Sequence, residues 1–125
     1  LVVDDHRLVR EGLRKLISAE ADMAVAGEAG SVAEMWELLG PGSCDVVVLD
    51  VTLPDRSGLE ALKEIKFVYP RLPVLIFSIH PEGQYAAQAL EEGAVGYMPK
   101  SSPAEKLVGA IRAAATRGRA HEPDQ

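Results

Sequence analysis

The amino-acid sequence predicts an α/β fold, a parallel sheet of five strands with helices on both faces. Two observations carry this prediction. Short apolar runs alternate five times with segments whose apolar residues recur at helical spacing, and such alternation is typical of parallel sheets. In addition, residues 46–49 are four consecutive apolar residues, which indicates a strand buried on both faces. The 125 residues suffice for one domain with a sizeable core.

The first unit is an apolar run, an acid pair and a helix. Residues 1–3 are apolar and are followed by Asp4 and Asp5. Residues 6–21 have apolar side chains at helical spacing and charges on the other face, which predicts an amphipathic helix with Asp5 as its N-cap. The apolar positions are Leu8, Val9, Leu13, Leu16 and Ile17.

The second unit has a strong helix-start signal. Residues 23–26 predict a short strand. Ser31 and Glu34 then form the pattern of a capping box, which predicts that a helix starts there. The glycines and the proline of residues 40–42 end this helix.

The third unit brings a carboxylate to the end of a buried strand. Residues 46–49 run directly into Asp50. Because an ionised carboxylate is costly inside a sheet, we expect Asp50 where the strand leaves the core. A loop follows, and a helix begins at Gly58 and ends before Pro70.

The fourth unit is a strand over residues 73–77, which ends at Ser78, and a helix over residues 81–92 closed by Gly93. The residues that we expect on the inward face of this helix are Tyr85, Ala86, Ala89 and Leu90.

The fifth unit is a weaker strand over residues 94–98, followed by Lys100. Pro103 then opens the last helix, which fades near residue 118. Five strand–helix units are too few for an eight-fold barrel. They fit a flavodoxin-like, doubly wound (βα)5 domain with strand order 2-1-3-4-5.

Composition narrows the function classes. The net charge of −6 argues against a nucleic-acid-binding surface on this segment. No apolar run approaches the roughly 20 residues that span a bilayer, and no signal-peptide pattern is present, so we expect no membrane association. The single cysteine, Cys44, excludes an internal disulfide and fits a reducing compartment, which here predicts the cytoplasm. The chain starts without a methionine, so we expect it to be a fragment.

Polar residues gather where the strands end. With strand order 2-1-3-4-5, the carboxyl ends of four strands carry Asp4 and Asp5, Asp50, Ser78 and Lys100 at one edge. Clustered carboxylates repel one another unless a cation neutralises them, and their hard oxygens suit Mg²⁺, or Mn²⁺ in its place. A hydroxyl and an ammonium are donors that suit an anion such as phosphate. Asp50 is then a candidate nucleophile that forms an acyl phosphate.

Four stretches carry a resemblance to a known family. They are Val3-Asp4-Asp5-His6, residues 48–58 (VLDVTLPDRSG), Phe77-Ser78 and residues 93–100 (GAVGYMPK). Through them nearly the whole chain resembles a bacterial two-component response regulator receiver domain. The acid pair followed by His6 and the stretch GYMPKSS are similar to the LuxR/NarL-type subfamily. We expect His6 itself to be a surface residue beside the acid pair.

The resemblance implies a phosphoacceptor and a metal site. Asp50 would accept a phosphoryl group from the phosphohistidine of a sensor histidine kinase. Asp4 and Asp5 would hold Mg²⁺, with Asp5 and Asp50 as direct ligands and the backbone carbonyl of Thr52 as a third. The domain would be a signalling domain rather than an enzyme, self-catalysing only phosphotransfer and its own dephosphorylation.

The resemblance also implies a switch and an output. Ser78 and Lys100 would bind the phosphoryl oxygens, and Tyr97 would be the aromatic that changes rotamer when Ser78 moves. Phosphorylation would favour a homodimer or release a C-terminal helix-turn-helix domain that binds DNA and is absent from this chain. Residues 1–118 would then be the receiver domain, and residues 119–125 the start of the linker.

Two residues depart from the commonest pattern of the family. Ile79 follows Ser78 where a small residue is more usual, so we expect altered rates of phosphotransfer and dephosphorylation. The proline precedes Lys100 instead of following it, and the Met98–Pro99 bond is open to either isomer.

Three alternative functions fit the sequence less well. A haloacid-dehalogenase-type phosphohydrolase needs a second acid two residues after its nucleophile, and Thr52 stands there. A pseudo-receiver that is never phosphorylated is disfavoured because every acceptor-site residue is present. A dinucleotide-binding protein would need a Gly-x-Gly-x-x-Gly turn after the first strand, which is missing.

Overall fold

The structure is a computed structural model that describes residues 1–78 and 84–120. Its strands are β1 Val2–Val3, β2 Glu28–Ala29, β3 Val47–Asp50, β4 Val74–Ser78 and β5 Gly96–Pro99. Its helices are α1 Arg7–Ser18, α2 Val32–Leu38, α3 Gly58–Val68, α4 Gln84–Glu91 and α5 Ala104–Ala120. Within the described ranges, no helix combines the length and the apolar character needed to cross a membrane.

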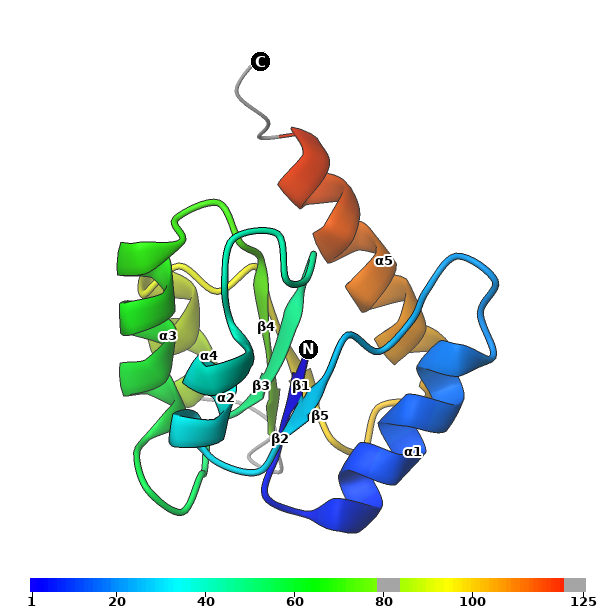
Figure 1. Ribbon diagram of the computed structural model, residues 1–125, viewed down its shortest axis with the longest axis horizontal. Coiled ribbons are helices and arrows are strands. Elements are labelled where there is room, and N and C mark those ends of the chain that lie inside the picture. The colour runs from blue at the N-terminus through cyan, green and yellow to red at the C-terminus, as the bar shows by residue number, and fades with distance from the viewer. Residues whose placement is uncertain (79–83, 121–125) are drawn as a thin grey trace.

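The five strands form one parallel sheet in the order β2-β1-β3-β4-β5, which confirms the predicted topology. Helices α1 and α5 cover one face, and α2, α3 and α4 cover the other (Figure 1). Strand β3 lies in the centre, and all four of its residues are buried. This burial explains why its apolar run is uninterrupted until the carboxylate.

Each face of the sheet has its own hydrophobic core. The core under α2, α3 and α4 contains Met35, Leu62 and Ile65, all fully buried. The core under α1 and α5 contains Leu13 and Ile111. The lone cysteine, Cys44, is half-buried and packs against the first core, as a small apolar residue would.

Several expected elements differ in position, among them the fifth strand, which was expected over residues 94–98 and lies at Gly96–Pro99. The second strand was expected over residues 23–26 but lies at Glu28–Ala29. This strand pairs with β1. Val2 of β1 is aligned with Glu28, so the pairing of the two strands begins at Glu28. The last helix was expected to fade near residue 118 and continues to Ala120.

Two expected side-chain roles are wrong, and one is confirmed. The N-cap of α1 is His6 rather than Asp5, because the helix begins one residue later than expected. Leu90 is exposed, because the neighbouring Ala89 faces the core and successive helical residues are about 100° apart. Ser31 caps α2 as predicted and accepts a hydrogen bond from the Glu34 amide at 3.1 Å. Tyr85 was also expected to face inward, but its side chain lies outside the part of the chain that the structure describes.

A close backbone approach at Gly58 shapes the loop after β3. The Gly58 amide donates to the Val51 carbonyl at 2.7 Å, which folds the loop back on the strand end. A Cβ at this position would overlap the Asp50 carbonyl oxygen and lie 2.7 Å from Val51 Cα. Only glycine permits this approach, so the first residue of α3 helps to fix the carboxylate-bearing end of β3.

We therefore expect Gly58→Ala to lower the free energy of unfolding by about 1–3 kcal/mol, the usual cost of overpacking. Urea unfolding of the variant and the wild type measures this difference in free energy. The matched control is Gly12→Ala in the interior of α1, where a Cβ would meet nothing within 4 Å. This control should be stabilised by about 0.5–1 kcal/mol, because alanine is the better helix former. Equal stability of Gly58→Ala and the wild type would contradict the role of the close approach.

Candidate functional site

The predicted carboxylates lie together at the carboxyl edge of the sheet. The register pairs Val3 with Leu49, so Asp4 follows β1 beside Asp50 at the end of β3. Both side chains are buried, with Asp4 1% and Asp50 3% exposed. Asp5 is exposed at the rim. The edge therefore holds two buried carboxylates with a third at its opening.

Lys100 supplies the counter-charge. Its ammonium nitrogen lies 2.7 Å from Asp4 Oδ2 and 3.3 Å from Asp50 Oδ2. Its backbone amide donates to the Ser78 carbonyl at 2.7 Å, which fixes the residue just beyond β5. Burial lowers the pKa of Lys100, but its hydrogen bond to Asp4 and the charges of Asp50 and Asp4 outweigh that effect and raise the pKa overall. The lysine is therefore charged at neutral pH.

The pKa of Asp50 is raised. Burial is the largest cause, and the charge of Asp4 adds to it. The hydrogen bond that the Thr52 amide donates to Asp50 Oδ1 at 3.2 Å and the nearby Lys100 ammonium act in the opposite direction. Ionisation of Asp50 therefore lowers the free energy of unfolding.

The remaining predicted residues belong to β4 and β5 or fall outside the described residues. Ser78 is the last residue of β4 and is fully buried. Tyr97 in β5 is half-buried and packs against the core under α2, α3 and α4. The Met98–Pro99 bond is trans, since the described residues contain no cis peptide bond. Ile79 lies outside the described residues.

The donor set at this edge fits a divalent cation. One ligand atom each from Asp4, Asp5, His6 and Asp50 lies within 4.8 Å of the others. Asp4 Oδ2 is fully buried, and its charge is offset by the Lys100 ammonium 2.7 Å away. Carboxylate oxygens with space beside them suit Mg²⁺. His6 is 65% exposed, which confirms it as a surface residue beside the acid pair.

The loop between β3 and α3 is anchored by residues that the sequence did not single out. Asp55 accepts hydrogen bonds at 3.0 Å from the amides of Val32 and Ala33, at the start of α2. Arg56 pairs with Glu64 through two hydrogen bonds, at 2.9 and 2.6 Å. The Asp55 contacts join residues more than twenty positions apart, so no local sequence pattern predicts them. Together, the Asp55 and Arg56 contacts tie the segment that follows Asp50 to α2 and α3.

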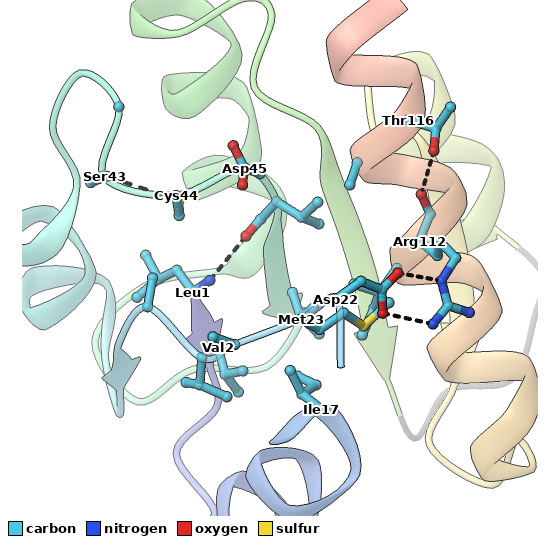
Figure 2. A pocket seen from close by; sticks show the side chains of 18 of the residues that line it. Leu1, Val2, Ile17, Asp22, Met23, Ser43, Cys44, Asp45, Arg112 and Thr116 are labelled. Atoms are coloured by element: carbon cyan, nitrogen blue, oxygen red, sulfur yellow. Dashed lines mark hydrogen bonds and ion pairs between the residues drawn. The ribbon is translucent and has the colours of Figure 1, made fainter. Parts of the chain in front are cut away.

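A cavity of about 610 Å³ lies at the opposite edge of the sheet. It is lined by the start of β1, the residues that lead into β3, and the end of α5 (Figure 2). Several of its polar groups pair within the protein. The Leu1 ammonium donates to the Val46 carbonyl at 3.0 Å, and Arg112 binds Asp22 at 2.9 Å. The carboxylate cluster belongs to the other edge, where sheets of this type bind ligands.

Comparison with known proteins identifies the family. The family model of the response regulator receiver domain matches residues 1–112. The uncharacterized transcriptional regulatory protein YxjL of Bacillus subtilis is 41% identical over 119 residues, which are 95% of this chain and 54% of that protein. The DNA-binding transcriptional activator DevR/DosR of Mycobacterium tuberculosis is 38% identical over 111 residues, which are 89% of this chain and 51% of that protein.

Solved structures agree as well. A two-component response regulator of the LuxR family from an Aurantimonas species has a TM-score of 0.86 and 41% sequence identity, over 92% of this chain and 82% of that one. A response regulator receiver domain protein from Clostridium thermocellum has a TM-score of 0.85 and 30% identity, over 95% and 94% of the two chains. The chain spans about half the length of the curated relatives it matches.

The raised pKa of Asp50 predicts a pH-dependent stability. A carboxyl whose pKa is raised by folding destabilises the protein progressively as the pH rises. The loss of stability occurs between 3.8, the ordinary pKa of the carboxyl, and its higher pKa in the folded state. Asn does not titrate, so in metal-free buffer Asp50→Asn should be more stable than the wild type at neutral pH. The gain should shrink as the pH falls from the folded pKa of Asp50 toward 3.8, and it should be lost below 3.8. Urea unfolding over a pH series measures it.

The matched control is Asp45→Asn, an exposed carboxylate just before β3, which should change stability little. Added Mg²⁺ should narrow or reverse the difference, because a cation that binds Asp50 stabilises only the wild type. A neutral-pH gain that persists unchanged in acid would contradict the proposed cost of ionising Asp50.

Proposed function

The chain belongs to the family of response regulator receiver domains, and on this premise we propose that Asp50 accepts a phosphoryl group from a sensor histidine kinase. The observation that carries the proposal is the pairing of the buried Asp50 with Lys100, 3.3 Å away, beside Asp4. This arrangement offers a nucleophilic carboxylate, a donor for phosphoryl oxygens and a ligand set for a cation at one edge. The domain acts as a signalling acceptor and not as a multiple-turnover enzyme.

In the proposed transfer, a carboxylate oxygen of Asp50 attacks phosphorus in line with the leaving group. The new bond joins Asp50 to phosphorus, and the bond between phosphorus and the kinase imidazole nitrogen breaks, which returns a neutral histidine once that ring takes up a proton. Lys100 donates to a phosphoryl oxygen and offsets its charge. Ser78, at the end of the neighbouring strand, donates to another.

Asp4, Asp5 and Asp50 would hold Mg²⁺, or Mn²⁺ in its place, together with the backbone carbonyl of Thr52. When bound, the cation supplies charge compensation for the attacking carboxylate and the transferred group. With Asp4 among the residues that hold the cation, the Lys100 ammonium, which here contacts Asp4 Oδ2 at 2.7 Å, would be available to the phosphoryl group.

The added charge of roughly −1.5 to −2 is the proposed switch signal. It draws Ser78 and Lys100 toward Asp50, and Tyr97 changes rotamer to follow Ser78. The face formed by β4 and β5 then changes shape, which favours a homodimer or frees an output domain. Because α5 runs antiparallel to the strands, its end lies far from Asp50 and close to the N-terminal edge of the sheet (Figure 1).

The output that we propose is regulation of transcription in the cytoplasm. The relatives are transcriptional regulators about twice the length of this chain. Residues 1–118 would be the receiver domain, and residues 119–125 would start a linker to a C-terminal helix-turn-helix domain that binds DNA. The net charge of −6 agrees with DNA binding by that other domain.

We expect acetyl phosphate with Mg²⁺ to add a single phosphoryl group to the chain, because a small donor needs only the acceptor site. Intact-mass measurement detects the adduct. Asp50→Asn should abolish it, and omission of Mg²⁺ should reduce the rate by at least about 100-fold, since the cation supplies several kcal/mol of charge stabilisation. The control Asp45→Asn keeps the acceptor site and should be labelled like the wild type.

The outcomes separate the alternatives. A chain that gains no adduct at any Mg²⁺ concentration is a pseudo-receiver. Release of inorganic phosphate over many turnovers would indicate a phosphohydrolase, which would need a general acid where Thr52 stands. An adduct that persists in Asp50→Asn would place the acceptor elsewhere and contradict the proposal.

A further inference from the structure

The side chain of His6 lies at the opening of the carboxylate cluster. Its Nδ1 atom is 3.2 Å from Asp4 Oδ1 and 3.1 Å from Asp5 Oδ1. The same nitrogen and one oxygen each of Asp4, Asp5 and Asp50 fall within 4.8 Å of one another. The cluster therefore offers one nitrogen donor among oxygen donors.

The backbone dictates this placement. His6 is the N-cap of α1 and has an extended conformation, with φ −93° and ψ 110°. Its amide donates to Asp4 Oδ1 at 2.8 Å, so the carboxylate folds back over His6. The imidazole makes no capping hydrogen bond to the helix. Its ring instead faces the two carboxylates that flank the opening.

Cations differ in their preference for nitrogen and oxygen ligands at such a site. Mg²⁺ prefers oxygen ligands in near-octahedral geometry and keeps several waters, so an imidazole adds little to its binding. Zinc and first-row transition-metal dications bind imidazole well and also accept carboxylates. An imidazole that binds through Nδ1 carries its proton on Nε2, which suits a ring with its other side in solvent.

We propose that His6 Nδ1 is a metal ligand that makes this site favour zinc and first-row transition-metal dications over Mg²⁺. The proposal rests on the metal site of the proposed function and extends it to the identity of the cation. The competing role for His6 is to donate a hydrogen bond to Asp4 and Asp5 and so orient them. That role would change the affinities for all dications by the same factor.

The test is titration of the whole chain with Zn²⁺ and with Mg²⁺ by calorimetry, in the wild type and in His6→Gln. Glutamine keeps a hydrogen-bond donor near the acid pair and removes the imidazole nitrogen. The affinity for Zn²⁺ should fall about tenfold or more, because losses of this size already follow when only supporting residues of metal sites are removed. The affinity for Mg²⁺ should change less than about twofold, because Mg²⁺ gains little from the nitrogen.

Two control variants assign the binding to this site. Asp50→Asn should weaken the binding of both cations, and Asp45→Asn, which removes an exposed carboxylate just before β3, should weaken neither. The proposal is overturned if His6→Gln lowers both affinities equally or neither, or if Asp50→Asn leaves Zn²⁺ binding intact. The titrations use no phosphoryl donor. A failure of Asp50 to accept phosphate would therefore leave their result unaffected and be recognised separately.

Discussion

The structure depends on a counter-charge between two buried carboxylates. Parallel pairing of β1 with β3 brings Asp4 and Asp50 side by side at the carboxyl edge of the sheet, where both are almost fully buried. Such a pair is costly unless a cation lies between its members. The Lys100 ammonium takes that place, in contact with both carboxylates. The ammonium therefore offsets part of the charge of the carboxylates without metal, and a bound cation or phosphoryl group must redistribute these contacts.

The segment after Asp50 is held firmly for the same reason. Gly58 allows the backbone to fold back onto the end of β3, and Asp55 ties the loop to the first amides of α2. A loop fixed at both points keeps the Thr52 amide on the Asp50 carboxylate. This rigidity presents the Asp50 carboxylate in one orientation, as the proposed phosphoryl transfer requires.

The sequence predicted the fold and the edge that carries the site, because both follow from periodicity and from one polar residue at each strand end. It missed what depends on three-dimensional contacts. The second strand lies at Glu28–Ala29, where β1 sets the pairing, and the N-cap of α1 is one residue beyond Asp5. The anchoring by Asp55 joins distant segments, and no local pattern encodes it. The contact of Lys100 with Asp4 is also tertiary, since it depends on where β5 ends relative to β1.

In the proposed switch, Lys100 leaves Asp4 to bind the phosphoryl group on Asp50. A crystal structure of the chain with Mg²⁺ and beryllofluoride, a phosphoryl mimic, would reveal this exchange. We expect beryllium on an Asp50 carboxylate oxygen, Lys100 Nζ within hydrogen-bond distance of a fluorine, and Mg²⁺ in place of the ammonium beside Asp4. A complex in which Lys100 keeps its 2.7 Å contact with Asp4, or in which the mimic binds another residue, would contradict it.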